Sequence, residues 1–230
     1  MTDRQEDSGI VLLISGRGSN ALAIIDAAGS HWFPTMVRAV VADRPAAGLQ
    51  QAARRGVDTA TVARTAYRNR EEFEAALGEV IDGYRPRLVV LAGFMRVLSA
   101  AFVDRYRERM LNIHPSLLPR YRGLHTHARA LAEGDAEHGA SVHWVTPELD
   151  SGPVIAQARV PVRAGDTEAT LARRVLAQEH RLYPAVLALL CAEPVTQLHD
   201  APFDPPLVLD RDLDDRGHIV RRRTTGADTP

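Results

Sequence analysis

The sequence predicts an α/β protein built on a mostly parallel, twisted sheet with helices on both faces. Three observations support this fold class. Apolar runs typical of buried parallel strands alternate with helical patterns through the first half of the chain. Two of these runs, residues 10–15 and 87–93, meet a glycine at their carboxyl ends. Finally, no internal repeat or compositional break precedes residue 200, which favours a single domain.

The first half of the chain follows a regular alternation of strands and helices. The expected strands cover residues 10–15, 36–42, 57–62 and 87–93, and the expected helices cover residues 19–28, 46–55 and 70–83. This rhythm is typical of strand–helix–strand units, which place successive strands parallel to one another.

The second half is less regular. A short helix (99–106) leads to MLNIHPSLLP, in which a short strand meets a proline-rich loop. We then expect a helix at 124–133, strands at 140–145 and 153–162, and a long amphipathic helix at 167–190 that begins at the capping residues Asp166 and Thr167. From about residue 201 the chain contains PFDPP and RRR, and we interpret it as an appendage, partly disordered.

Composition excludes several classes of protein. The chain has 230 residues, with 28 Lys and Arg against 29 Asp and Glu, so its net charge of -1 gives no electrostatic drive toward nucleic acids or membranes. Cys191 is the only cysteine, so no intrachain disulfide can form. No signal peptide and no apolar run of roughly 20 residues are found, and we expect a cytoplasmic protein.

The segment ISGRGSNA lies where the first strand passes into a helix. Gly16 and Gly18 permit backbone conformations that side chains forbid, while Ser19 and Asn20 can cap the helix. Three interpretations stay open from these residues: a tight turn without a ligand, a dinucleotide site with Asp43 as the ribose-binding acid, or a site for one phosphate group at the helix N-terminus.

Asn112 and His114 lie two residues apart at a strand end, so their side chains can point the same way. An amide and an imidazole together suit a reaction that develops negative charge on an acyl oxygen. The alternative is a capped loop with a satisfied histidine. The chain has nine histidines, but their spacing is not that of a zinc site, and we expect His125 and His127 to form hydrogen bonds within the loop.

Two carboxylates are further candidates. Asp150 precedes a Ser-Gly-Pro turn and either stabilises that turn or lies beside His114, where it would favour the imidazolium form. Glu179, in the segment AQEH of the long helix, is either a solvated helix charge or a carboxylate that binds polar groups of a substrate.

Several motifs resemble the phosphoribosylglycinamide formyltransferase family. The matching segments, in the same order over about residues 9 to 190, are ISGRGSN, LVVLAGFMRVLS, MLNIHPSLLP, GLHTH, EHGASVHWVTPELDSGPV and AQEH. The resemblance implies a Rossmann-like formyltransferase fold, with a catalytic domain at residues 1–200 and a tail at residues 201–230. Pro147 departs from the family pattern, which has an acidic residue there, and the tail matches no pattern.

The resemblance also implies site residues. The catalytic residues would be Asn112, His114 and Asp150. The residues that bind glycinamide ribonucleotide and its phosphate would be Gly18, Ser19, Asn20, Leu176, Ala177, Gln178 and Glu179. The folate-binding residues would be Arg70, Met95, Arg96, Val97, Leu98, Asn112, Thr146, Pro147, Glu148, Leu149 and Asp150.

The implied activity is transfer of the formyl group of 10-formyltetrahydrofolate to the amine of glycinamide ribonucleotide, a step of purine biosynthesis. The resemblance implies small-molecule substrates only, no metal, no nucleic acid and no membrane, in a monomer or homodimer. Alternatives within the superfamily are methionyl-tRNA formyltransferase, which shares SLLPRYRG, and formyltetrahydrofolate deformylase. From other classes, an NAD-dependent oxidoreductase and a non-catalytic ribonucleotide-binding module stay open.

Overall fold

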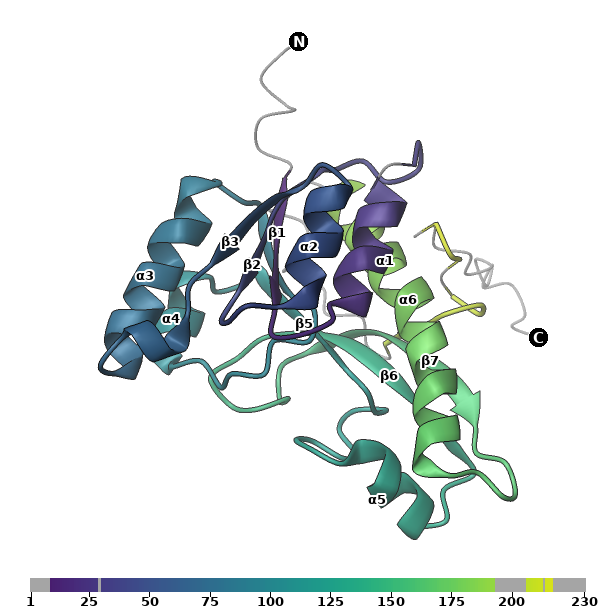
Figure 1. Cartoon of the computed structure of the whole chain (residues 1–230). Helices are drawn as coiled ribbons and strands as arrows, with labels where there is room; N and C mark the ends of the chain where they lie inside the picture. Colours follow the sequence, from purple (N-terminus) through teal and green to yellow (C-terminus); the bar gives the residue numbers. More distant parts are fainter. Residues whose placement is uncertain (1–8, 29, 193–205, 213, 217–230) are drawn as a thin grey trace, which may run out of the picture.

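Five consecutive apolar residues form β1 (Ile10–Ile14), an interior strand of the sheet, and all five are fully buried. A computed structural model describes residues 9–28, 30–192, 206–212 and 214–216 (Figure 1). The remaining strands are β2 (Val37–Ala42), β3 (Asp58–Thr61), β4 (Leu88–Leu91), β5 (Met110–His114), β6 (Glu137–Trp144), β7 (Val154–Pro161) and β8 (Leu207–Val208). They form one sheet of eight strands in the order β3-β2-β1-β4-β5-β6-β7-β8.

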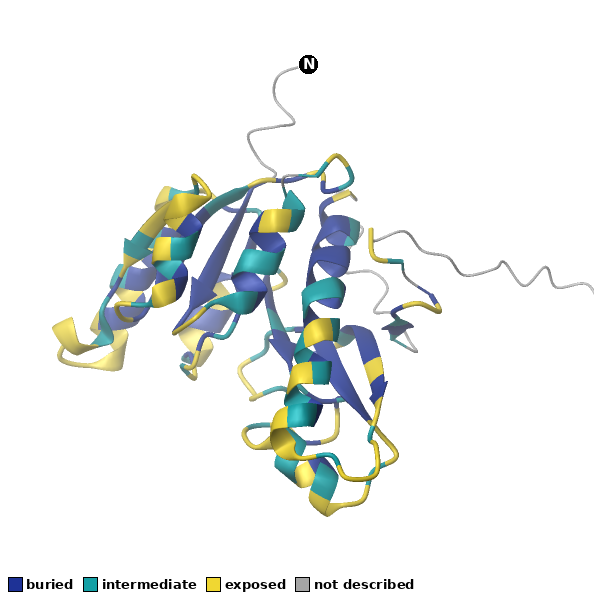
Figure 2. Ribbon diagram, turned by 45° about the vertical axis from the view of Figure 1, so that its right-hand side comes forward, coloured by how far each residue is buried: buried dark blue, intermediate teal, exposed yellow. Residues whose placement is uncertain are grey.

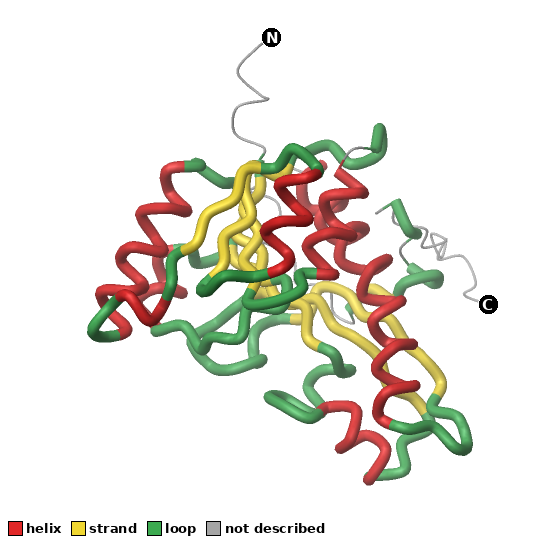
Figure 3. The backbone as a smooth tube through the Cα atoms, viewed as in Figure 1, coloured by secondary structure: helices red, strands yellow, loops and turns green. Residues whose placement is uncertain are grey.

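Strands β1 to β5 are mutually parallel wherever they pair, whereas β6 runs antiparallel to both β5 and β7. The helices, drawn red around the yellow sheet in Figure 3, are α1 (Ser19–Ala28), α2 (Ala47–Arg54), the 3-10 turn η1 (Arg64–Ala66), α3 (Arg70–Gly83), α4 (Ala100–Arg105), α5 (Thr126–Ala132) and α6 (Glu168–Ala192). The predicted fold class is therefore confirmed. Within the described part of the chain, no helix is both long and apolar enough to span a bilayer.

Two hydrophobic cores lie on opposite faces of the sheet, and the alternation of β1 supplies both. Ile10, Leu12 and Ile14 pack with α1 and α6 on one face, while Val11 and Leu13 pack with α3 and α4 on the other. Figure 2 shows the dark, buried strands between helices whose outer surfaces are exposed. A continuous apolar run was the correct signal because both faces of these parallel strands are covered.

Two element boundaries differ from the expected ones for identifiable reasons. The helix expected from residue 124 begins instead at Thr126, because His125 adopts a left-handed backbone conformation with φ of 59°. Strand β6 begins at Glu137, three residues before the expected Ala140, because its pairing with β7 continues as far as Pro161. At the other end of β7, the long helix starts as predicted, with the Thr167 hydroxyl accepting a hydrogen bond from the Thr170 amide.

Part of the segment beyond residue 201 joins the sheet. Strand β8 pairs in parallel with β7, and Leu207 and Leu209 are buried in the core beneath α6. Arg181 of α6 forms ion pairs with Asp210 and Asp215 at 2.7 Å each. Residues 201–205, 213 and 217–230 of the predicted tail lie outside the described residues, as do residues 193–200 before it.

The topology determines where a site can form. The strand order reverses between β1 and β4, so the loops that leave their carboxyl ends diverge and open a crevice. The segment from Gly16 to Asn20 follows β1, the segment from Gly93 to Leu98 follows β4, and His114 ends β5. The motifs that the sequence singled out therefore converge on one edge of the sheet.

Candidate active site

A cavity of 540 Å³ lies at the carboxyl ends of β4 and β5. Its walls come from the loop after β4, the end of β5, the segment before α5 and the loop between β6 and β7. All residues implied for folate except Arg70 line it: Met95, Arg96, Val97, Leu98, Asn112, Thr146, Pro147, Glu148, Leu149 and Asp150. Met95, Val97, Leu124 and Leu149 line this cavity and expose more than half of their surface, a concentration of apolar groups that is typical of binding sites.

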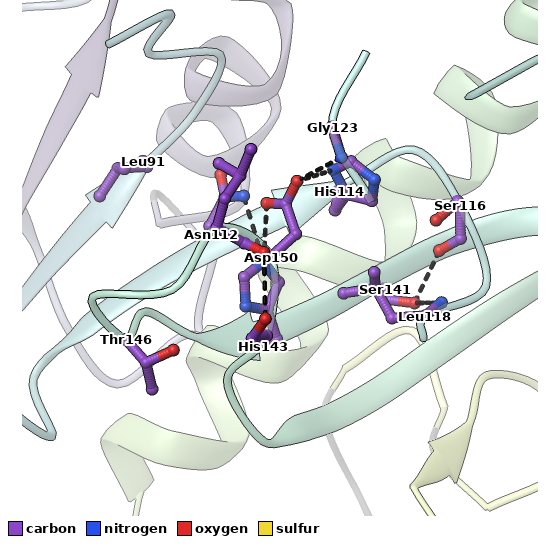
Figure 4. Close-up of polar contacts among 12 residues, drawn as sticks. Leu91, Asn112, His114, Ser116, Leu118, Gly123, Ser141, His143, Thr146 and Asp150 are labelled. Carbon is purple, nitrogen blue, oxygen red and sulfur yellow. Dashed lines mark hydrogen bonds and ion pairs between the residues drawn. The ribbon is translucent and has the colours of Figure 1, made fainter. Parts of the chain in front are cut away.

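Asp150 and His114 meet inside this cavity. The imidazole Nδ1 of His114 lies 3.3 Å from Oδ2 of Asp150, and both side chains are almost fully buried. The carboxylate is held by the backbone amide of Gly123, which donates to Oδ2 at 2.9 Å (Figure 4). Asp150 has a left-handed backbone, with φ of 49°, which turns the chain so that this side chain points inward.

The other ring nitrogen of His114 is engaged on the opposite side. Its Nε2 lies 2.8 Å from the backbone carbonyl oxygen of Tyr121. The guanidinium groups of Arg120 and Arg129 lie 4.9 and 5.1 Å from the centre of the Tyr121 ring, and the Tyr121 hydroxyl donates to Asp135 at 2.6 Å. The His114 ring is thus held by the Tyr121 carbonyl at Nε2 and by the Asp150 carboxylate at Nδ1. Nδ1 is the nitrogen on the side of the cavity.

Asn112 is oriented by a second histidine, His143. The Nδ1 atom of His143 faces the carbonyl oxygen of Trp144 at 2.9 Å, so Nδ1 carries the proton and Nε2 is left as an acceptor. The amide nitrogen of Asn112 donates to that Nε2 at 3.2 Å. Burial is the main cause that lowers the pKa of His143, which keeps the ring neutral and able to accept.

Two polar side chains of neighbouring strands form hydrogen bonds with the backbone of the loop that follows His114. The hydroxyl of Ser141 donates to the carbonyl oxygen of Ser116 at 2.7 Å and accepts from the Leu118 amide at 3.0 Å. Gln157 of β7 donates to the Leu118 carbonyl oxygen and to Ser141, both at 2.9 Å. Neighbouring strands therefore satisfy the polar groups of this buried loop, which fixes its path.

The glycine turn after β1 forms a separate region. Gly18 has φ of 67°, and an added Cβ would lie 3.2 Å from the Ile14 side chain. The turn leads directly into α1, whose first amide groups have no partner within the helix, an arrangement that suits an anion. Asn20 donates from its amide to the Glu179 carboxylate at 2.7 Å, which joins α1 to α6. Burial raises the pKa of Glu179, and the hydrogen bond from Asn20 opposes that rise.

A scan against protein-family models matches residues 8–187 to the formyl transferase family. This chain belongs to that family. A curated relative, phosphoribosylglycinamide formyltransferase of Escherichia coli K12, is 55% identical over 180 residues, which cover 78% of this chain and 85% of the relative. The family predicted from the motifs is thus confirmed.

Solved structures agree. The phosphoribosylglycinamide formyltransferase of Coxiella burnetii superposes with a TM-score of 0.77 at 50% identity, covering 80% of this formyl transferase and 87% of the other chain. The glycinamide ribonucleotide transformylase 1 of Symbiobacterium toebii gives a TM-score of 0.79 at 44% identity, covering 81% and 89%.

The implied nucleotide-binding residues of this formyl transferase lie apart from the 540 Å³ cavity, whose lining includes none of them. Gly18, Ser19 and Asn20 open α1, and Leu176 to Glu179 lie on α6; the Asn20–Glu179 contact joins the two groups. Arg70 begins α3, donates to the Val97 carbonyl oxygen at 2.8 Å and lines a neighbouring cavity of 270 Å³.

One prediction about histidines is wrong for His127. Its ring does not bond within the loop; its Nδ1 lies 3.1 Å from Nε2 of His138 on β6. Because α5 begins at Thr126, His127 lies in its first turn and faces His138 of β6. The same prediction for His125 finds no support, since no side-chain capping bond is formed there. No group of three or more His, Cys, Asp or Glu suited to a metal ion occurs among the described residues.

Sequence reasoning assigned no role to His143, Tyr121 or Ser141. His143 contacts Asn112 because β6 pairs antiparallel with β5 in a register that sets these two residues opposite each other. Two signals were available: the alternation in SVHWV, which places Ser141 and His143 on one face, and the two arginines that flank the Tyr121 segment.

Proposed function

We propose that this formyl transferase moves the formyl group of 10-formyltetrahydrofolate to the amine of glycinamide ribonucleotide, a step of purine biosynthesis. One observation carries the proposal. Asn112, His114 and Asp150 converge at an apolar cavity in a chain whose relatives are named phosphoribosylglycinamide formyltransferase. Purine biosynthesis fits the cytoplasm, which remains the expected compartment; a monomer or a homodimer remains a prediction.

The 540 Å³ cavity is the place for the formyl donor. Its apolar rim suits a flat, partly aromatic ligand, and Asn112 and Asp150 supply the polar groups at its inner end. In this arrangement Arg70 acts from the side: its guanidinium holds the Val97 carbonyl oxygen and the Glu74 carboxylate, which supports the wall formed by residues 95–98.

The phosphate of glycinamide ribonucleotide fits the turn at Gly18, Ser19 and Asn20. Two features support this assignment: the left-handed backbone of Gly18, and the first amide groups of α1, which have no acceptor within the helix. The buried carboxylate of Glu179 can then accept hydrogen bonds from hydroxyl groups of the ribonucleotide. The carbonyl oxygen of the Asn20 amide is buried and has no partner among the described residues, so it is also available.

For the chemistry, we assign a separate task to each of the three side chains. The substrate amine attacks the formyl carbon, and negative charge develops on the formyl oxygen. The second N–H of Asn112, not used by His143, and the Nδ1–H of His114 would stabilise that charge. The amine must lose a proton and the departing folate nitrogen must gain one. Asp150, in contact with His114, is positioned to pass that proton, directly or through a water molecule. No step requires a metal.

The experiment is an absorbance assay with purified protein, glycinamide ribonucleotide and a 10-formyl folate analogue, compared with the same mixture lacking the amine. Formyl transfer only when the amine is present is the expected result. Release of formate to water alone would indicate a deformylase, and folate or ribonucleotide binding without turnover would indicate a binding module. Transfer to methionyl-tRNA instead would also overturn the proposal.

A further inference from the structure

Asp43 is a buried carboxylate that the proposed chemistry does not use. It follows β2 directly, and its side chain has 0% exposure. In a dinucleotide-binding protein an acid at this place would face a ribose. Here the Asp43 carboxylate is buried and accepts hydrogen bonds from protein donors, so any effect on a ligand must pass through a neighbouring residue.

Its neighbours are two arginines and a serine. Arg44 donates to both carboxylate oxygens, at 3.1 and 2.9 Å, and Arg96 donates from Nε to Oδ2 at 2.6 Å. Burial favours the neutral acid, but the hydrogen bonds from Arg44, Ser15 and Arg96 outweigh it and lower the pKa of Asp43. Ionised Asp43 is thus a fixed negative charge beneath Arg96.

Arg96 belongs to the loop that forms one wall of the donor cavity. Its side chain is 36% exposed, and Arg96 lines both the 540 Å³ cavity and the adjoining 270 Å³ cavity. The Nε of Arg96 donates to Asp43. No acceptor for the two terminal amino groups of Arg96 is found among the described residues. Arg64, Arg70 and Glu74 line the smaller cavity as well. Glu74 is paired with Arg70, so Asp43 is the carboxylate that balances the charge of Arg96.

The same corner anchors the loop backbone. Ser15, which hydrogen-bonds to Asp43, accepts from the Met95 amide through its hydroxyl at 2.8 Å, and its own amide donates to the Gly93 carbonyl oxygen at 3.0 Å. The loop is therefore tied to the ends of β1 and β2 next to the point where Asp43 meets Arg96.

We propose that Asp43 is a positioning residue for the formyl donor: it holds Arg96, and with it the wall at residues 95–98, in the geometry that receives the folate. This inference rests on the proposed function. Without the Asp43 carboxylate, Arg96 loses its only carboxylate partner among the described residues and turns away from the arginines beside it, so the cavity must be rebuilt each time a donor binds.

The test is Asp43→Asn, which keeps the size of the side chain and one acceptor oxygen. We expect KM for the formyl donor, and the Kd of a non-reactive folate analogue measured by calorimetry, to rise about tenfold. The kcat value and KM for glycinamide ribonucleotide should stay within about twofold of wild type. The matched control is Arg44→Gln, which removes the exposed partner of Asp43 but leaves the contact with Arg96, and should change donor KM by less than about twofold.

A double-mutant cycle separates positioning from general stabilisation. If Asp43 acts through Arg96, Asp43→Asn should add little to the donor KM of an Arg96→Gln chain. The inference would be overturned if the effects of the two substitutions on donor KM were additive, or if donor KM did not change in Asp43→Asn. It would also be overturned if kcat, the affinity for both substrates and Tm all fell together. If Asp43→Asn does not fold, Arg96→Lys, which keeps the charge but loses the Nε–H donor, must show the same selective rise in donor KM.

The two proposals fail in different ways. If the wild-type chain binds the folate analogue but transfers no formyl group, the proposed function is wrong. The calorimetric Kd values of wild type and Asp43→Asn can still be compared in that case. A wild-type chain that transfers normally, with equal analogue affinity in Asp43→Asn, ends the role of Asp43 alone.

Discussion

The two polar regions at the carboxyl edge of the sheet are built in different ways. The turn after β1 is made of consecutive residues, Gly16 to Asn20, and presents backbone amide groups. From elsewhere in the chain, the Gly48 amide donates to the Gly16 carbonyl oxygen at 3.1 Å and Glu179 accepts from Asn20. The cluster at the end of β5 works through side chains from three places: residue 112 and residue 114 on β5, His143 on β6 and Asp150 in the loop beyond.

The geometry of the turn is therefore set locally, whereas that of the β5 cluster depends on the tertiary fold. A glycine turn that opens a helix has its geometry as soon as the local backbone forms. The β5 cluster exists only when β5, β6 and the following loop are all in register. We therefore expect side-chain changes to affect the rate strongly at the β5 cluster, and to affect mainly affinity and stability at the turn.

The largest effect should come from the contacting pair His114 and Asp150, to which we assign the charge and proton steps. His114→Ala and Asp150→Asn should each lower kcat by about 10²–10³, because each removes a group that acts on charge or protons in the transition state. Asp150→Asn keeps an oxygen that can accept from the Gly123 amide, so the loop should stay in place. Steady-state kinetics with both substrates provides the measurement.

Glu137→Gln serves as the control for that comparison, since Glu137 is an exposed carboxylate on β6 that pairs only with Arg159 among the described residues. It should retain normal kcat. Near-normal formyl transfer in both His114→Ala and Asp150→Asn would remove the cluster from the chemistry altogether.

A smaller effect is expected at His143, which contacts Asn112 rather than the reacting atoms. His143→Ala leaves the Asn112 amide free to rotate, and we expect kcat to fall about tenfold, by the loss of one oriented donor. His143→Gln, which offers another acceptor, should recover part of the rate. Equal losses in the two variants would mean that His143 fills space instead of orienting the amide.

At the turn, Glu179→Gln should weaken binding yet stabilise the fold. We expect about a tenfold rise in KM for glycinamide ribonucleotide, from the loss of a charged hydrogen-bond acceptor, with little change in kcat. Stability should move the other way. Burial raises the pKa of Glu179 in the folded chain, so its contribution to stability is complete below its ordinary value near 4.5 and is lost as the pH rises through the raised value.

Thermal unfolding of the two chains between pH 4 and pH 8 provides the measurement. The Tm advantage of Glu179→Gln should be small at the acid end and should grow with pH. The glutamine can donate to the buried Asn20 amide oxygen, for which the described part of the chain offers no other partner. An advantage that shrinks as the pH rises would contradict this account.

Sequence reasoning reached the parts of this molecule that are local or follow the sheet's connectivity. Apolar runs such as Ile10–Ile14 and the glycine after β1 are contiguous signals, and the parallel order brings Asn112 and His114 to the right edge. The alternation in SVHWV indicates the face on which His143 lies, but its contact with Asn112 depends on an antiparallel register that one sequence does not specify. The position of the Tyr121 carbonyl depends in the same way on a left-handed backbone. The two-residue β8 was missed because so short a strand has no periodicity to detect.

The smallest effect is expected where that short strand meets α6. Arg181, two residues after Glu179, pairs with Asp210 and Asp215, but all three side chains are at least 36% exposed. Such pairs contribute roughly 0.2–1 kcal/mol each, so Arg181→Met should lower Tm by about 2–4 °C at low salt and by less in 0.5 M NaCl. Arg173→Met is the matched control, because Arg173 is exposed on the same helix and has no partner among the described residues. A salt-independent loss of Tm would show that Arg181 holds β8 through its apolar stem instead of its charge.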